Sequence, residues 1–121
     1  MINELSLQVH KNNKAKGFYD DEKNIGEMLC LIHSEVSEAL EADRKNRYTE
    51  YKIHAVNGLV EDEDFKNTFE THIKDTFEDE IADSVIRLFD LAAFKGIDLE
   101  AHIKAKMRYN SMRPHKHGKQ Y

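Results

Sequence analysis

The feature that most constrains the fold is the helical spacing of apolar residues in two long segments of the chain. The first segment, about 22–45, and the second, about 65–94, each place apolar side chains on one face at 100° per residue. These side chains are Ile25, Met28, Leu29, Ile32, Val36, Ala39 and Leu40 in the first segment and Ile81, Val85, Leu88, Phe89 and Ala92 in the second. Five glycines and one proline are too few turn-forming residues for an all-β fold. We therefore predict an all-α protein, an antiparallel helical bundle of four to five helices.

Residues suited to helix ends predict the boundaries in the first third of the chain. A short helix is expected within 1–16, ending at Gly17. Asp20 or Asp21 is expected to cap the helix at 22–45, because an acidic side chain suits the positive end of a helix.

The segment 46–64 is the least regular part of the chain. It contains the turn signal Asn57-Gly58 and an acidic run at 61–64. We predict a surface connection there, with room for a short helix around 48–56.

The last third of the chain carries a clear helix stop and a clear helix start. Gly96 is expected to end the helical pattern of 65–94, and Asp98 to cap a last helix over about 99–112. Pro114 cannot continue that helix, and the basic tail from about 114 to 121 is expected to run over the surface.

Composition narrows the class of protein. A chain of 121 residues and 14.1 kDa with 40% apolar residues predicts one folded domain over 1–121. A net charge of -5 argues against binding to a nucleic acid polymer. One cysteine excludes an internal disulfide and points to a reducing compartment. Without an 18-residue apolar run or a signal peptide after Met1, we expect a cytoplasmic protein with no membrane partner.

Two acidic pairs lie inside the two best helical segments. Glu35 and Glu38, like Glu80 and Asp83, are spaced i, i+3, so each pair occupies neighbouring rows of one helix face. Most of these acids border the apolar face, and side-by-side packing of the two helices would bring four carboxylates to one seam. Such a cluster is costly to bury unless a hard cation such as Mg²⁺ or Mn²⁺ offsets its charge. The alternative is two solvated helix faces, since 23 acids make this spacing easy to reach by chance.

Candidate ligands for an anionic substrate lie nearer the two ends of the chain. Lys106, Asn110 and Arg113 recur at i, i+4, i+7 and would project from one side of the last helix, where Lys and Arg can bind phosphate. The alternative is a solvated helix end whose cations suit the helix dipole. Tyr19 lies close to Gly17 and can stack on a base or pack at the core edge, and His10 is a second, weaker candidate.

Taken together, these motifs resemble those of the MazG-like branch of the all-α nucleoside triphosphate pyrophosphohydrolases. The resemblance rests on an ExxE pair, a later ExxD pair, the sequence GIDL and the pattern KxxxNxxRP. The matching stretches are HKNNKAKGFYD at 10–20, NIGEMLCLIHSEVSEALEADR at 24–44, FEDEIADSVIRLFDLAAFKGIDLEAHIKAKMRYNSMRP at 77–114 and HGK at 117–119. The segment 46–76 has no counterpart in the family pattern.

The resemblance implies a MazG-like helical bundle, completed by assembly into a homodimer or homotetramer. It implies Mg²⁺-dependent cleavage of NTPs or dNTPs between the α and β phosphates, giving a nucleoside monophosphate and pyrophosphate, as in nucleotide-pool house-cleaning. The implied metal ligands are Glu35, Glu38, Glu80 and Asp83. The implied substrate-binding residues are Lys106, Asn110 and Arg113 for phosphates or sugar and His10 and Tyr19 for the base, with Tyr19 where a tryptophan is common.

The role of Glu38 is a hypothesis within this interpretation. A glutamate of the first pair can orient the attacking water as general base while its neighbour keeps the metal. Two other interpretations compete with an enzyme: a non-catalytic nucleotide-binding or metal-binding regulatory module on the same scaffold, and a helical interaction module whose acidic stripe meets a basic partner.

Overall fold

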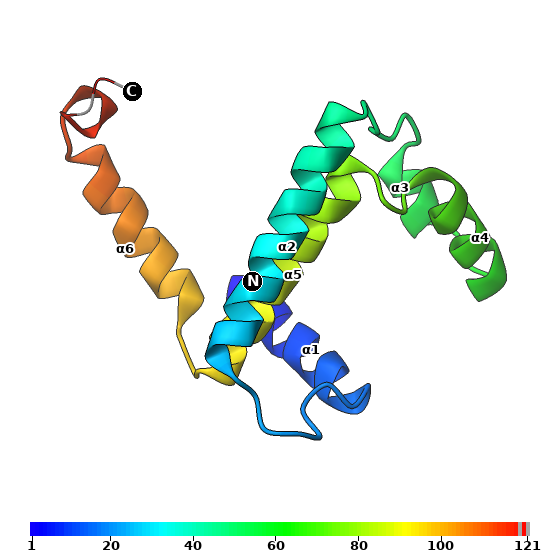
Figure 1. Cartoon of the computed structure of the whole chain (residues 1–121), viewed down its shortest axis with the longest axis horizontal. Helices are drawn as coiled ribbons and strands as arrows, with labels where there is room; N and C mark the ends of the chain where they lie inside the picture. The colour runs from blue at the N-terminus through cyan, green and yellow to red at the C-terminus, as the bar shows by residue number, and fades with distance from the viewer. Residues whose placement is uncertain (119, 121) are drawn as a thin grey trace. The chain divides into compact units, whose positions relative to one another are not determined.

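The computed structural model describes residues 1–118 and 120, and these residues form helices and loops without a strand (Figure 1). The helices are α1 (Ile2–Ala15), α2 (Ile25–Arg44), α3 (Ile53–Asn57), α4 (Asp62–His72), α5 (Phe77–Phe94) and α6 (Leu99–Ser111), followed by the 3₁₀ helix η1 (His115–Gly118). The predicted all-α bundle is confirmed. Across the described residues, the length and apolar character needed to cross a bilayer are not combined in any one helix.

The chain divides into two compact units, and each is described by itself. Unit 1 combines Met1–Glu22 with Leu88–Tyr121, and unit 2 is Lys23–Arg87. The boundary between the units lies within α5, so this helix contributes its first residues to unit 2 and its last residues to unit 1.

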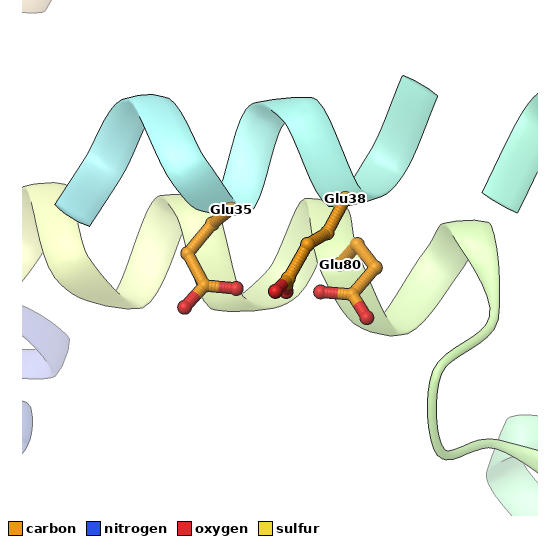
Figure 2. Close-up of side chains that lie close together, drawn as sticks. All are labelled: Glu35, Glu38 and Glu80. Carbon is orange, nitrogen blue, oxygen red and sulfur yellow. The ribbon is translucent and has the colours of Figure 1, made fainter. Parts of the chain in front are cut away.

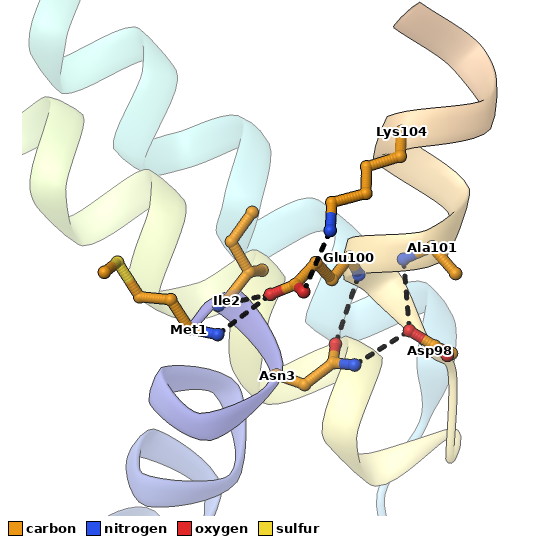
Figure 3. Close-up of polar contacts among 7 residues, drawn as sticks. All are labelled: Met1, Ile2, Asn3, Asp98, Glu100, Ala101 and Lys104. Carbon is orange, nitrogen blue, oxygen red and sulfur yellow. Dashed lines mark hydrogen bonds and ion pairs between the residues drawn. The ribbon is translucent and has the colours of Figure 1, made fainter. Parts of the chain in front are cut away.

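In unit 1, the start of α1 is joined to the start of α6 by a set of polar contacts (Figure 3). The Glu100 carboxylate accepts hydrogen bonds from the Met1 ammonium and from the Ile2 N–H at 3.0 and 2.9 Å. The Asn3 side chain donates to Asp98 at 2.8 Å and accepts from the Glu100 N–H at 3.1 Å. These contacts satisfy N–H groups that the first turn of a helix would otherwise leave without a partner.

The predicted boundaries around α6 are confirmed. Gly96 has a positive φ of 66°, and the Ile97 N–H that follows it returns to the Ala92 carbonyl at 2.9 Å, which closes the end of α5. Asp98 is the N-cap of α6, and its side chain accepts a hydrogen bond from the Ala101 N–H.

The predicted cap of the second helix is wrong. The N-cap of α2 is Asn24, whose side chain accepts from the Glu27 N–H at 3.1 Å, so the helix begins at Ile25. Asp20 is instead held in the turn that follows α1, where its N–H donates to the carbonyl of Gly17, a glycine with a φ of 86°. Neither Asp20 nor Asp21 therefore reaches the first turn of α2.

In unit 2, α2 lies antiparallel to the first part of α5. Glu35 contacts Arg87, and Glu38 lies beside Glu80, so the residue number rises along one helix as it falls along the other. The buried residues of this unit are Ile32, Glu35, Ala39, Ala42, Val56, Ile73, Glu80 and Ser84.

The helical pattern predicted over 65–94 is divided into α4 and α5 by a break after His72. α4 ends at its C-cap Ile73, and Asp75, with a φ of 65°, adopts a left-handed conformation in the turn that follows. The Thr76 hydroxyl oxygen then accepts from the Asp79 N–H, and the Asp79 carboxylate accepts from the Asp75 N–H, which starts the next helix. With α3 and the separate α4, the described residues contain more helices than the four to five expected.

The acidic run at 61–64, predicted as part of a surface connection, instead starts a helix. Glu61 is the N-cap of α4, and Asp62, Glu63 and Asp64 occupy its first turn. Carboxylates are favourable there because they face the positive end of the helix dipole.

Candidate metal centre between α2 and α5

Three glutamates from two helices bring their carboxylates together. Glu35 and Glu38 come from α2, Glu80 comes from α5, and one oxygen of each lies within 4.8 Å of the others. Figure 2 shows the Glu38 carboxylate between those of Glu35 and Glu80. The arrangement follows from the i, i+3 spacing on α2, which places both side chains on the side that faces α5.

Glu80 is the most buried member of this cluster. Its residue is only 6% exposed, and its Oε2 atom is buried without a hydrogen-bond partner among the described residues. Burial, then the hydrogen bond and charge of Glu38, and then the charges of Asp83 and Glu35 raise the pKa of Glu80 from 4.5 to about 7. At neutral pH, Glu80 is therefore a buried, partly ionised carboxylate for which the described residues provide no ion-pair partner.

Glu35 does have a cationic partner. The Arg87 Nε atom donates to Glu35 Oε1 at 2.8 Å, with the arginine side chain 40% exposed and the glutamate side chain 12% exposed. Sequence reasoning missed Arg87, although its spacing gave a signal: Arg87 follows Asp83 by four residues and Glu80 by seven, so it shares their helix face. We infer that Arg87 positions the Glu35 carboxylate within the cluster.

Arg87→Leu is expected to lower the free energy of unfolding by about 1–2 kcal/mol, because it leaves the buried Glu35 carboxylate without its ion-pair partner. The loss is smaller than for a fully buried pair, because the Arg87 side chain is partly exposed and solvent screens its charge. The measurement is urea unfolding followed by circular dichroism. Arg87→Lys should recover part of the loss. Equal stability of wild type and Arg87→Leu would show that the ion pair contributes nothing.

Asp83 lies near the cluster but is not one of the residues whose oxygens meet within 4.8 Å. Burial, followed by the charges of Asp79 and Glu35, raises its pKa, and the Arg87 charge opposes that rise. Glu80 belongs to a second acidic group, with Asp75 and Asp79. The structure therefore brings together three of the four expected metal ligands and adds two acidic neighbours, Asp75 just before α5 and Asp79 in its first turn.

The three predicted phosphate ligands near the end of α6 lie in unit 1. Lys106 is exposed, and its Nζ atom lies 5.1 Å from the centre of the Tyr109 ring. The Arg113 guanidinium lies 5.7 Å from the same ring, and Asn110 and Arg113 are half-buried. The predicted HGK segment at 117–119 ends at Lys119, which lies outside the described residues.

His10 and Tyr19 also lie in unit 1, where His10 Nδ1 and the Tyr19 hydroxyl contact one buried carboxylate. His10 Nδ1 lies 2.8 Å from Asp90 Oδ1, and the Tyr19 hydroxyl donates to Asp90 Oδ2 at 2.6 Å. The two rings meet edge to face at 4.6 Å, and Tyr19 also packs on Phe94 at 5.1 Å. Burial and the contact with Asp90 raise the pKa of Tyr19. His10 and Tyr19 are therefore packed in a cluster with Asp90 and Phe94.

Comparisons with protein-family models, with curated proteins and with solved structures found no match to this chain. A set of carboxylate oxygens with one buried oxygen left without a partner fits a hard divalent cation, which prefers oxygen ligands.

Proposed function

We propose that this protein is a Mg²⁺-dependent, MazG-like nucleoside triphosphate pyrophosphohydrolase. It would cleave an NTP or dNTP between the α and β phosphates to release a nucleoside monophosphate and pyrophosphate, with Mn²⁺ as a possible substitute ion. The observation that carries the proposal is the unpartnered Glu80 oxygen, buried beside the carboxylates of Glu35 and Glu38. A bound cation would relieve that uncompensated charge.

Each residue of the cluster has a distinct part in this proposal. Glu35 and Glu80 are the buried ligands, and Arg87 holds Glu35 by its hydrogen bond. Glu38 is exposed, so its carboxylate can both reach the ion and accept a proton from an attacking water as general base. When bound, Mg²⁺ supplies polarisation of the phosphate oxygens and neutralises their charge. Asp83 completes the acidic surroundings as a fourth, weaker candidate ligand.

A cation in α6, Lys106, and a cation just after that helix, Arg113, extend the proposal to the substrate. Lys106 and Arg113 would bind the charged phosphates, and Asn110 would add a directed hydrogen bond. We also propose a cytoplasmic location, because Cys30 is an exposed free thiol that a reducing compartment keeps reduced.

The experiment that tests the proposed function is a product analysis. The purified protein is incubated with a panel of NTPs and dNTPs, with Mg²⁺ or with EDTA, and the products are resolved. The expected result is monophosphate plus pyrophosphate, lost with EDTA and lost in Glu35→Gln. Folded protein that binds Mg²⁺ but turns over no nucleotide would contradict the proposal and favour a non-catalytic binding module.

Exposed apolar side chains support self-association into a homodimer or homotetramer. The expected apolar face of α2 is only partly covered: Ile32 and Ala39 are buried, whereas Leu29, Val36 and Leu40 are 44%, 54% and 49% exposed. The residues of α5 in unit 2 add Ile81, Val85 and Ile86, which are also exposed. Apolar surface of this extent commonly marks a protein interface, and we propose that a second copy of the chain covers it.

The double substitution Val36→Glu and Leu40→Glu is expected to convert the assembly to a monomer, because it places charges at the centre of the proposed interface. The measurement is sedimentation velocity over a concentration series. Glu27→Gln, a change at an exposed residue in the first turn of the same helix, serves as control. An unchanged mass for the double variant would place the interface elsewhere, and a monomeric wild type would refute self-association.

A further inference from the structure

Two adjoining hollows open on unit 2 beside the metal centre. The first, about 270 Å³, is lined by Glu38, Glu41, Lys45, Arg47, Asp75 and Glu80. The second, about 690 Å³, is lined by residues of 46–51 and 71–76. Arg47 and Asp75 line both hollows, so these two residues lie at the border of each. The first hollow includes two of the proposed metal ligands, and the second lies entirely within the segment that the family pattern does not contain.

Arg47 is held by its backbone at the junction. Its N–H donates to the Ala42 carbonyl and its carbonyl accepts from the Phe77 N–H, both at 2.8 Å, which ties it to the end of α2 and the start of α5. Its guanidinium has no hydrogen-bond or ion-pair partner within residues 1–118 and 120. Lys45, by contrast, already pairs with Glu41 at 3.8 Å. Arg47 is thus an available planar cation next to the carboxylates of the first hollow, which suits a phosphate brought in with its metal ion.

The second hollow offers aromatic surface. Tyr51 and His72 stack with ring centres 4.5 Å apart and planes 21° from parallel. Both residues line the second hollow, and Tyr51 is 38% exposed. Bases of any identity stack on such surfaces, because every base has a π-face.

The loop that carries Tyr51 is fixed to the helices on either side of it. The Thr49 N–H donates to Glu78 Oε2, and the Thr49 hydroxyl accepts from the Tyr51 N–H, each at 3.1 Å. The Tyr48 hydroxyl donates to Asp43 near the end of α2, and its ring packs on Phe77 at 5.0 Å. A loop held in this way loses little conformational entropy when a ligand binds.

These groups match the parts of a nucleotide bound with its metal ion. The carboxylates of Glu38 and Glu80 suit the ion, the cation of Arg47 suits the phosphates, and the rings of Tyr51 and His72 suit the base. We propose that the nucleoside of the substrate stacks on the Tyr51–His72 pair while Arg47 contacts the phosphates beside the metal centre. This inference rests on the proposed function and names the base-binding surface of the same site. It assigns that surface to the segment 46–76, in place of His10 and Tyr19, whose polar atoms already bind Asp90.

The test is calorimetric titration of the whole chain in Mg²⁺ with two probes: pyrophosphate, and the α,β-methylene analogues of ATP and UTP. Tyr51→Ala is expected to weaken binding of the analogues at least about 5-fold, because stacking contributes about 1–3 kcal/mol per base. It should leave pyrophosphate binding within about 2-fold, since no base is present. Arg47→Gln is expected to weaken both probes about 10-fold, as loss of a charge-assisted hydrogen bond predicts.

Matched variants separate stacking and charge from general damage to the fold. Tyr51→Phe keeps the ring and should bind the analogues as wild type does, and His72→Ala should reproduce the selective loss of Tyr51→Ala. Arg44→Gln removes an arginine of α2 that does not line either hollow, and it should bind both probes normally.

The outcomes distinguish this inference from the proposed function. If wild type binds Mg²⁺ and both probes, but Tyr51→Ala and His72→Ala bind the analogues equally well, the base-binding surface is wrong while the proposed function survives. If Arg47→Gln binds pyrophosphate as wild type does, the phosphate contact is wrong. If wild type binds neither probe in Mg²⁺, the proposed function fails and the inference fails with it.

Discussion

Glu38→Gln is expected to lower kcat at least about 100-fold while the helical circular dichroism spectrum and the thermal midpoint stay close to wild type. The side chain is exposed and its carboxylate lies between those of Glu35 and Glu80, so glutamine fills the same space without an acceptor for the proton of water (Figure 2). Loss of a general base typically costs 10²–10⁴ in rate. The measurement is pyrophosphate release at saturating nucleotide and Mg²⁺.

Two comparisons show whether Glu38 acts as a base or only as a metal ligand. Glu27→Gln, on the exposed first turn of α2, should retain wild-type turnover. If raising Mg²⁺ above the concentration that saturates wild type restores the rate of Glu38→Gln, the residue serves mainly to bind the ion. Full turnover of Glu38→Gln at the Mg²⁺ concentration that saturates wild type would remove Glu38 from the reaction.

Glu80→Gln is expected to stabilise the metal-free protein at neutral and higher pH while abolishing its stabilisation by Mg²⁺. Glu80 binds its proton more tightly in the folded chain, where its pKa is about 7, than in the unfolded chain, where it is 4.5. The contribution of this group to stability is therefore fully present below pH 4.5 and is lost as the pH rises through 7. The neutral amide removes that loss, so Glu80→Gln is expected to have the higher free energy of unfolding at pH 8.

The measurement is urea unfolding of wild type and Glu80→Gln in EDTA from pH 5 to pH 8, repeated in Mg²⁺. The difference between the two proteins should grow with pH in EDTA and shrink or reverse in Mg²⁺, because the ion compensates the carboxylate of wild type alone. A difference that does not change with pH would mean that the chain itself already compensates the Glu80 charge.

Local sequence signals predicted the helices and the acidic pairs well because both depend on neighbours a few residues apart. Gly96 ends α5 through its own positive φ, and Asp98 starts α6 by capping the first turn of that helix. Both boundaries were therefore predicted correctly. The break after α4 was missed because the apolar period continues across it. It depends on a left-handed Asp75 and on the cap made by Thr76, a conformation that the pattern of apolar residues does not encode.

Long-range pairings were beyond local reasoning. Arg87 meets Glu35 across 52 positions of sequence, and His10 meets Asp90 across 80. The spacing of Arg87 placed it on the helix face of Glu80 and Asp83, but no spacing rule connects it to Glu35 on another helix. In the same way, nothing local showed that Asp90 contacts His10 and Tyr19. The three glutamates were predicted together because the helix period had already placed them on the right faces, and only the packing of two helices had to be supplied.

The continuity of α5 across the boundary between the two units limits how this protein can be dissected. Arg87 and Leu88 are consecutive residues of one helix, yet they belong to different units. A cut between them would leave the last four carbonyl groups of the shortened helix without their partners and would remove the turn that follows Arg87. Neither unit is therefore an excisable module, and a deletion or a fusion that respects the fold must treat residues 77–94 as indivisible.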